Sequence, residues 1–165
     1  MRYAQIRKLD VANGTGVRTS IFVTGCSHKC FNCFNQEYQD FDFGKVWTGK
    51  ETNKLIEYLK DDHIKGLSIL GGEPMENAMD LTSLLEKVKE ATSKSIWLWS
   101  GYTYEEILEN PNMKKLLSKI DVLVDGKFIE GKKDLTLKFR GSSNQRVINV
   151  KASMESGKVI LELED

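Results

Sequence analysis

The sequence predicts an α/β fold, an open, partial (βα) barrel with mostly parallel strands, and three observations support this prediction. Short apolar stretches alternate with amphipathic stretches along the chain, a pattern typical of parallel strands joined by right-handed crossovers. The chain has 165 residues, whereas a complete eight-stranded barrel typically needs about 250. Glycine-containing motifs follow the predicted strands, at the end where such folds carry their sites.

Four stretches of the chain have the composition of buried strands. They are residues 18–24 (RTSIFVT), 67–70 (LSIL), 95–100 (SIWLWS) and 121–126 (DVLVDG). Each stretch is short, apolar and rich in β-branched or aromatic residues, as expected for strands covered on both faces. The tail, residues 151–165, contains the alternating run KVILELE, which reads as an extra strand at the end of a single domain 1–165.

Helix signals lie between and after these strands. Two pairs of residues have the form of capping boxes at helix N-termini: Thr48 with Glu51, and Thr103 with Glu106. The helix after the first box is expected to end near Gly66, and a second helix is expected over residues 78–91. Pro111 interrupts the helical region that follows the second box, so that region should break there.

The composition argues against several classes of partner. The chain has 24 basic and 24 acidic residues, so its formal net charge is zero and long-range attraction to nucleic acid or anionic lipid is weak. No run of about 18 consecutive apolar residues occurs, and the first residues, MRYAQIRKLD, lack the apolar core of a signal peptide. We therefore expect a cytoplasmic protein with no nucleic-acid or membrane partner.

All three cysteines of the chain lie in one short window, Cys26-x3-Cys30-x2-Cys33. Such a cluster cannot form a disulfide framework, and in a reducing compartment it usually binds metal or does redox chemistry. A zinc site completed by His28 is one interpretation, although most zinc sites use two separated ligand pairs. A cubane iron–sulfur cluster with one iron left for a non-protein ligand is another. A third treats the thiols as small buried hydrophobes, which the polar neighbours disfavour.

The CxxxCxxC motif after the first predicted strand, followed by GGEP after the second, resembles the radical S-adenosylmethionine superfamily. The resemblance implies a barrel of the radical SAM type. It also implies that Cys26, Cys30 and Cys33 hold a [4Fe–4S] cluster and that the amino and carboxylate groups of S-adenosyl-L-methionine chelate the fourth iron. The ligand missing from the protein is then supplied by the cofactor.

The loops after the strands supply further candidate residues. Glycines at 71 and 72 let the backbone approach a ligand closely, and Glu73 adds negative charge suited to a cationic group. By the resemblance, Gly71, Gly72, Glu73 and Pro74 form the motif that binds the methionine amino group. Ser100, at the end of the third strand, is placed to hydrogen-bond the ribose or carboxylate, and equally suits a helix-entry position.

Four other residues complete the candidate cofactor-binding set, which also includes Cys33. Asp125 and Lys127 match a D-x-K motif that reaches the cofactor in related glycyl radical activating enzymes, and they also suit an ordinary polar turn. Asn32 stands before the last cysteine, where members of the superfamily often carry an aromatic residue. Phe34 is then expected to cover the adenine or the cluster instead.

Other segments narrow the family. DVANGTGVR, residues 10–18, resembles the NGPGxR segment of enzymes that activate glycyl radical proteins, with Thr15 where proline is usual. IWLWSGY, VLVDGKF and RGSSNQRV resemble more closely the activating proteins of class III, anaerobic ribonucleoside-triphosphate reductases. The resemblance implies an enzyme in which a flavodoxin- or ferredoxin-type donor reduces the cluster. S-adenosylmethionine is then cleaved, and a glycyl radical forms on the reductase.

Two alternative functions stay open at this point. One is activation of pyruvate formate-lyase or another glycyl radical enzyme, although such activators are generally longer. The other is a non-catalytic zinc-binding interaction module.

Two aromatic residues and one polar run are assigned to other roles. Trp97 and Trp99 share one face of their strand by the period-two rule, which favours a place in the core or an interface. The run from Lys138 to Arg146 is either a solvated loop or the lining of an open flank that contacts a macromolecular substrate.

Overall fold

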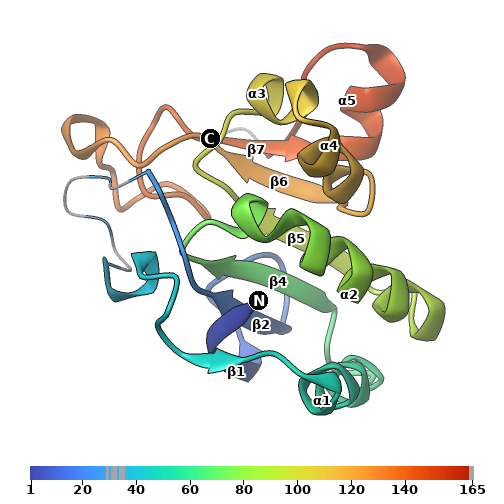
Figure 1. Cartoon of the computed structure of the whole chain (residues 1–165). Helices are drawn as coiled ribbons and strands as arrows, with labels where there is room; N and C mark the ends of the chain where they lie inside the picture. Colours follow the sequence, from blue (N-terminus) through green and yellow to red (C-terminus); the bar gives the residue numbers. More distant parts are fainter. Residues whose placement is uncertain (29, 31–32, 34–35, 164–165) are drawn as a thin grey trace.

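The computed structural model describes residues 1–28, 30, 33 and 36–163. In this part of the chain, eight strands form one mixed sheet in the order β3-β1-β2-β4-β5-β6-β7-β8 (Figure 1). The strands are β1 (Arg2–Asp10), β2 (Arg18–Val23), β3 (Lys45–Val46), β4 (Gly66–Gly71), β5 (Ser95–Trp99), β6 (Val122–Asp125), β7 (Arg146–Asn149) and β8 (Leu161–Leu163). The predicted α/β class is confirmed.

The four predicted strands form the parallel centre of the sheet, where β2, β4, β5 and β6 pair in that order. The prediction that the strands are mostly parallel is wrong, because β1, β3, β7 and β8 all pair antiparallel with their neighbours. Antiparallel strands can be joined by a short turn, whereas parallel strands need a crossover. Residues 11–17 make such a direct return between β1 and β2.

Five helices accompany the sheet in the described residues. They are α1 (Gly49–Leu59), α2 (Ala78–Ala91), α3 (Tyr104–Glu109), α4 (Pro111–Leu117) and α5 (Val150–Ser156). Both predicted capping boxes are present, at the N-termini of α1 and α3, and Pro111 begins α4 after the break. The expected helix end near Gly66 is wrong. The helix α1 ends at Leu59, a turn closed by the Ile64 N–H on the Asp61 carbonyl follows, and Gly66 begins β4.

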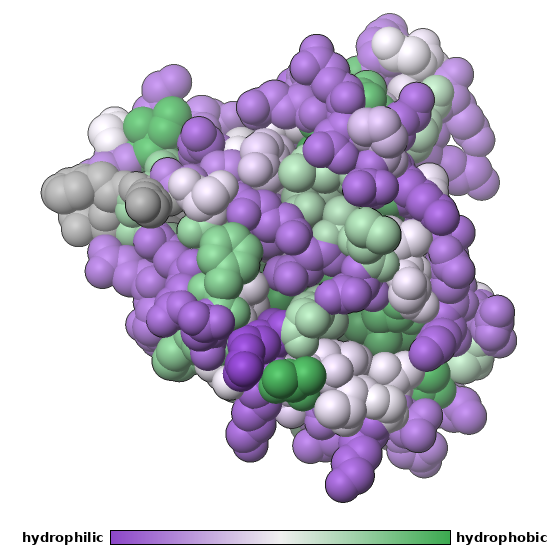
Figure 2. Space-filling model, in the orientation of Figure 1, coloured by the Kyte–Doolittle hydropathy of each residue, from purple (hydrophilic) through white to green (hydrophobic). Residues whose placement is uncertain are grey.

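The main hydrophobic core lies between the helices and one face of the sheet. Alternate residues of the parallel strands, among them Ile21, Leu67, Leu98 and Leu123, pack there against side chains of α1, α2 and α4. Figure 2, viewed from the same side, shows a largely hydrophilic surface with scattered hydrophobic areas. No helix in the described part of the chain has the length and apolar character needed to cross a membrane.

The other face of the sheet carries a row of side chains that the helices do not cover. Phe22 pairs with Leu70 across β2 and β4, and Trp99 pairs with Val124 across β5 and β6. These four residues alternate with the helix-facing set, as the two-residue period of a strand requires. They therefore line one level of the helix-free face, at the carboxyl ends of the parallel strands.

Arg18 fills the opposite end of this helix-free face. Its side chain is fully buried, donates from Nε to the Ser68 hydroxyl (2.8 Å), and stacks over the Trp97 ring at 5.5 Å. Its Nη2 donates to the carbonyl oxygens of Leu67 (2.9 Å) and Ser95 (3.0 Å). Burial lowers the pKa of Arg18 to about 10, partly offset by Asp121. Because these donors are satisfied by the sheet, the buried Arg18 is a structural part of this face.

Candidate cofactor site

A cavity of about 530 Å³ lies over the row formed by Phe22, Leu70, Trp99 and Val124. Its other walls come from the cysteine-bearing loop, the loops after β4, β5 and β6, and the segment between β6 and β7. Figure 1 shows these loops gathered at one end of the parallel strands. The volume is typical of sites for small ligands, and the apolar floor with polar loops above it is typical too.

The cavity brings together most of the residues that the sequence singled out. The predicted site residues among its lining are Cys26, Cys30, Cys33, Gly71, Gly72, Glu73 and Ser100. None of the three cysteines is in a disulfide, all three are half-buried, and none belongs to the hydrophobic core. The interpretation of the thiols as buried core residues is therefore wrong.

The electrostatic surroundings of Cys30 couple it to other loops. Burial raises the pKa of the Cys30 thiol, and the charge of Cys33 acts in the same direction. A hydrogen bond with the Phe128 backbone and the positive charge of Lys127 lower it in part. The segment after β6 therefore lies against the cysteine-bearing loop, close enough to affect its chemistry.

The donor set of the cavity distinguishes between the two metal interpretations. Among the described residues, no group of three or more His, Cys, Asp or Glu side chains is arranged around a single ion position. A single zinc ion needs each ligand sulfur within about 2.3 Å of one point, whereas the thiolates of a cubane cluster each bind a different iron. Three cysteine side chains on the walls of one cavity therefore suit a cluster better than a single zinc ion.

The loop after β4 is fixed to the start of the cysteine-bearing loop by backbone hydrogen bonds. The Gly72 N–H donates to the Val23 carbonyl at 2.9 Å, and the Glu73 N–H donates to the Gly25 carbonyl at 2.7 Å. Pro74 is buried and begins the short 3₁₀ helix Pro74–Asn77, so it supports the loop and does not line the cavity.

Glu73 is fully buried and ties three loops together. Its Oε1 accepts hydrogen bonds from His28 Nε2 (2.7 Å) and the Gly101 N–H (2.6 Å). Its Oε2 accepts hydrogen bonds from the Met75 N–H (2.8 Å) and the Ser100 hydroxyl (2.9 Å). Sequence reasoning expected this carboxylate to offer charge to a ligand, and the structure shows in addition that it organises the loops around the cavity.

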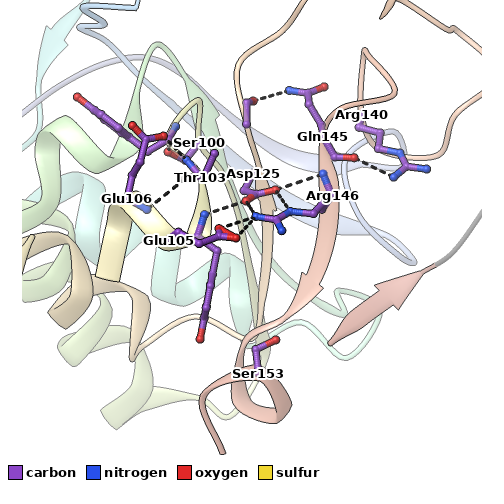
Figure 3. Close-up of polar contacts among 12 residues, drawn as sticks. Ser100, Thr103, Glu105, Glu106, Asp125, Arg140, Gln145, Arg146 and Ser153 are labelled. Atoms are coloured by element: carbon purple, nitrogen blue, oxygen red, sulfur yellow. Dashed lines mark hydrogen bonds and ion pairs between the residues drawn. The ribbon is translucent and has the colours of Figure 1, made fainter. Parts of the chain in front are cut away.

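Asp125 and Lys127 are placed differently from the expectation, since neither lines the cavity. Asp125 is buried and accepts hydrogen bonds from Arg146 Nη2 (2.6 Å), Arg146 Nε (3.1 Å) and the Tyr104 N–H (2.8 Å). Figure 3 shows Arg146 between Asp125 and Glu105. Hydrogen bonding from Arg146 also holds the pKa of Glu105 below its ordinary value. Asp125 therefore joins β6, β7 and α3, whereas its neighbours Val124 and Gly126 line the cavity.

Several cavity residues were not predicted. Trp99 lines the floor, and its indole Nε1 donates to the Phe139 carbonyl at 2.7 Å. Phe139 and Phe128 also line the cavity, and Phe139 adopts a left-handed backbone with φ of 63°. For Trp99, the sequence signal that could have pointed to the cavity was its position on the same strand face as Trp97. Phe139 had no local signal, since it reaches the cavity through a long loop.

The residues of the polar run between Lys138 and Arg146 contribute to different parts of the site. Arg140 and Gln145 line the cavity, whereas Arg146 belongs to the cluster with Asp125. The Gln145 amide donates to the Gly126 carbonyl (2.9 Å) and accepts from the Gly141 N–H (2.9 Å), which holds this segment over the site (Figure 3). Asn32 and Phe34, also in the predicted set, lie outside the described residues.

A family model described as a 4Fe–4S single cluster domain matches residues 12–148. The anaerobic ribonucleoside-triphosphate reductase-activating protein of Vibrio cholerae is 45% identical over 150 residues, which cover 88% of this chain and 96% of that protein. The chain belongs to this family. The activating proteins of Escherichia coli K12 (38%) and phage T4 (37%) are each similar over 152 residues. These residues cover 89% of this chain and 97% or 93% of the relative, respectively.

Membership of the activating-protein family assigns the chain an iron–sulfur cofactor, in agreement with the cysteine spacing. The matched cluster domain contains every predicted cavity residue, from Cys26 to Ser100. All of β1, together with α5 and β8, falls outside the match. The predicted residues that line the cavity therefore lie within the matched domain, and Arg7 of β1 lines the cavity from outside it.

Proposed function

We propose that this protein is a glycyl radical activating enzyme that acts on an anaerobic ribonucleoside-triphosphate reductase. The observation that carries the proposal is one cavity lined by three cysteine side chains and by the Gly71–Glu73 loop, in a chain of the activating-protein family.

The residues of the cavity fit a [4Fe–4S] cluster with one iron left for S-adenosyl-L-methionine. Cys26, Cys30 and Cys33 would bind three irons, and the chain contains no fourth cysteine. His28, the other candidate ligand in this window, has its Nε2 directed to Glu73. When bound, the cluster and S-adenosylmethionine would supply reductive cleavage of the sulfonium and abstraction of a hydrogen atom from a glycine Cα of the reductase.

The other residues of the cavity would orient the cofactor and exclude water. Phe22, Leu70, Trp99 and Val124 give the cavity an apolar floor, which suits chemistry that water and oxygen would quench. Gly71 and Gly72 present backbone to the cavity beside the Glu73 carboxylate, and this arrangement suits a ligand that carries an ammonium group.

The remaining predicted residues have supporting parts in the proposal. Ser100 lines the cavity and donates to Glu73, so it would hold the carboxylate as well as face the ligand. Pro74 and Asp125 would act from behind the site, and Lys127 through its charge near Cys30. Asn32, together with Phe34 as a cover for the adenine or the cluster, completes the proposed set.

We further propose that the sheet corresponds to the open, partial barrel of radical SAM enzymes and that residues 1–165 form one domain. The parallel order of β2, β4, β5 and β6, with all four following loops at one cavity, supports this assignment. A flavodoxin- or ferredoxin-type protein in the cytoplasm would donate the electron.

Electron paramagnetic resonance spectroscopy tests the function. The anaerobically reconstituted, chemically reduced protein is mixed with S-adenosylmethionine and the reductase encoded by the same genome, and a glycyl doublet is expected on the reductase. Omission of S-adenosylmethionine should remove the signal. A doublet on pyruvate formate-lyase, with none on the reductase, would contradict the assigned substrate.

A further inference from the structure

His28 is an interior side chain in the polar loop that carries the cysteines. Its side chain is only 5% exposed, and its Nε2 lies 2.7 Å from Oε1 of Glu73, whose side chain is 1% exposed. The other histidine of the chain provides a contrast, because the His63 side chain is 92% exposed and contacts Asp61 at the surface. Burying an imidazole and a carboxylate together is costly unless they are paired, so the contact determines how the loop packs.

Three neighbours fix the orientation of the His28 ring. The Glu73 carboxylate accepts from Nε2, and the Tyr102 ring packs edge-on with centroids 4.4 Å apart. The third neighbour is Gly101, where a Cβ atom would lie 2.7 Å from His28 Cδ2 and 2.8 Å from Nε2. A side chain at position 101 would therefore displace the ring.

A second tie joins the same loop to the residues after β4. The backbone N–H of Ser27 donates to Oε1 of Glu76 at 3.1 Å, and the Ser27 hydroxyl donates to the same oxygen. The Tyr102 hydroxyl also donates to that oxygen, at 3.3 Å. The two residues that follow Cys26 are thus held by two carboxylates of one loop, and the His28 contact is the buried one of the two.

We propose that His28 is a positioning residue that sets the three thiols in register with the Gly71–Glu73 loop. This inference rests on the proposed function, because the two loops would contact the two halves of one cofactor assembly. Thiolate–iron bonds can hold the cysteines on a cluster without help from His28. The distance from that cluster to the Gly71–Glu73 loop has no such covalent support, and the His28–Glu73 contact is the buried side-chain tie between the two loops beyond their backbone hydrogen bonds.

Loss of His28 should affect cluster assembly and cofactor affinity differently. In His28→Ala, the iron content after anaerobic reconstitution should stay within about 20% of wild type, since the thiols are unchanged. The concentration of S-adenosylmethionine needed to change the resonance spectrum of the reduced cluster should rise about tenfold or more, the typical cost of one charge-assisted hydrogen bond. The KM for S-adenosylmethionine should rise with it, while kcat at saturation falls less than about threefold.

Three further variants make the test specific. His28→Gln keeps an N–H donor toward Glu73 and should recover part of the lost affinity. Gly101→Ala should weaken binding without changing His28 itself, and it should add less than about twofold when His28 is already alanine. His63→Ala is the matched control, because it removes the exposed histidine, and it should bind S-adenosylmethionine as the wild type does.

The outcomes separate this inference from the proposed function. A wild-type protein whose cluster spectrum ignores S-adenosylmethionine would overturn both. A responsive wild type together with a His28→Ala protein of equal affinity would overturn the inference alone. So would a His28→Ala protein that folds but fails to retain iron, because His28 would then serve cluster assembly. If His28→Ala does not fold, His28→Gln and Gly101→Ala decide by the same spectral titration.

Discussion

Replacing Cys30 with alanine should abolish cleavage of S-adenosylmethionine, with activity at least about a thousandfold below wild type, while the protein stays folded. The loss follows because a cubane cluster left with two protein thiolates has lost one of its anchoring bonds. The fold should survive because Cys30 is half-buried and lies outside both hydrophobic cores. The midpoint of thermal unfolding of the apoprotein should shift by no more than about 3 °C.

Iron and sulfide analysis after anaerobic reconstitution, together with circular dichroism melting of the apoprotein, measures both halves of this prediction. Cys26→Ala and Cys33→Ala should behave in the same way, since the three thiols line one cavity. Ser93→Ala, at an exposed position away from the site, is the control and should retain iron and activity. Wild-type cleavage rates in the folded Cys30→Ala protein would contradict the ligand assignment.

The second large effect is expected from Gly71→Ala, which should destabilise the fold by about 3 kcal/mol or more. Gly71 has φ of 122°, a backbone conformation that costs other residues about 1–3 kcal/mol. A Cβ atom there would lie 2.6 Å from the Val23 nitrogen and closer still to the Val23 carbonyl oxygen. Both neighbours are backbone atoms of β2, so relief requires that the central strand pair move apart.

Urea unfolding followed by tryptophan fluorescence measures this change in free energy. Gly49→Ala is the matched control, because nothing lies within 4 Å of a Cβ at that position and the residue begins helix α1. That substitution should leave stability unchanged or raise it by up to about 1 kcal/mol. An equal effect of the two substitutions would show that the packing of β2 against Gly71 does not constrain the loop.

The parallel centre of the sheet and the cysteine site were readable from the sequence, because each has a strong local signal. Apolar runs such as LSIL and DVLVDG leave few alternatives to a buried strand, and the three thiols fall in one short window. The outer strand β1 has no such signal. Apart from the buried Asp10, its residues are half-buried or exposed and they are largely polar, so the pairing of β1 with β2 depends on tertiary context.

The arrangement inside the site depends on contacts between residues far apart in the chain, and local patterns do not predict these. Asp125 matched a cofactor-binding motif, but Arg146, 21 residues later, reaches its carboxylate through β7. The period-two rule placed Trp97 and Trp99 on one face, but it does not say which face the helices cover. The partners of Glu73 follow from three loops that meet only in the folded chain.

The central claim is that three cysteines hold a [4Fe–4S] cluster and that its fourth iron is reserved for S-adenosylmethionine. Mössbauer spectroscopy of protein reconstituted with isotopically enriched iron tests this most directly. The account predicts a [4Fe–4S] spectrum in which one iron site alone changes when S-adenosylmethionine is added. A cluster with four equivalent, unresponsive irons, or a protein that binds one zinc ion and no sulfide, would contradict it.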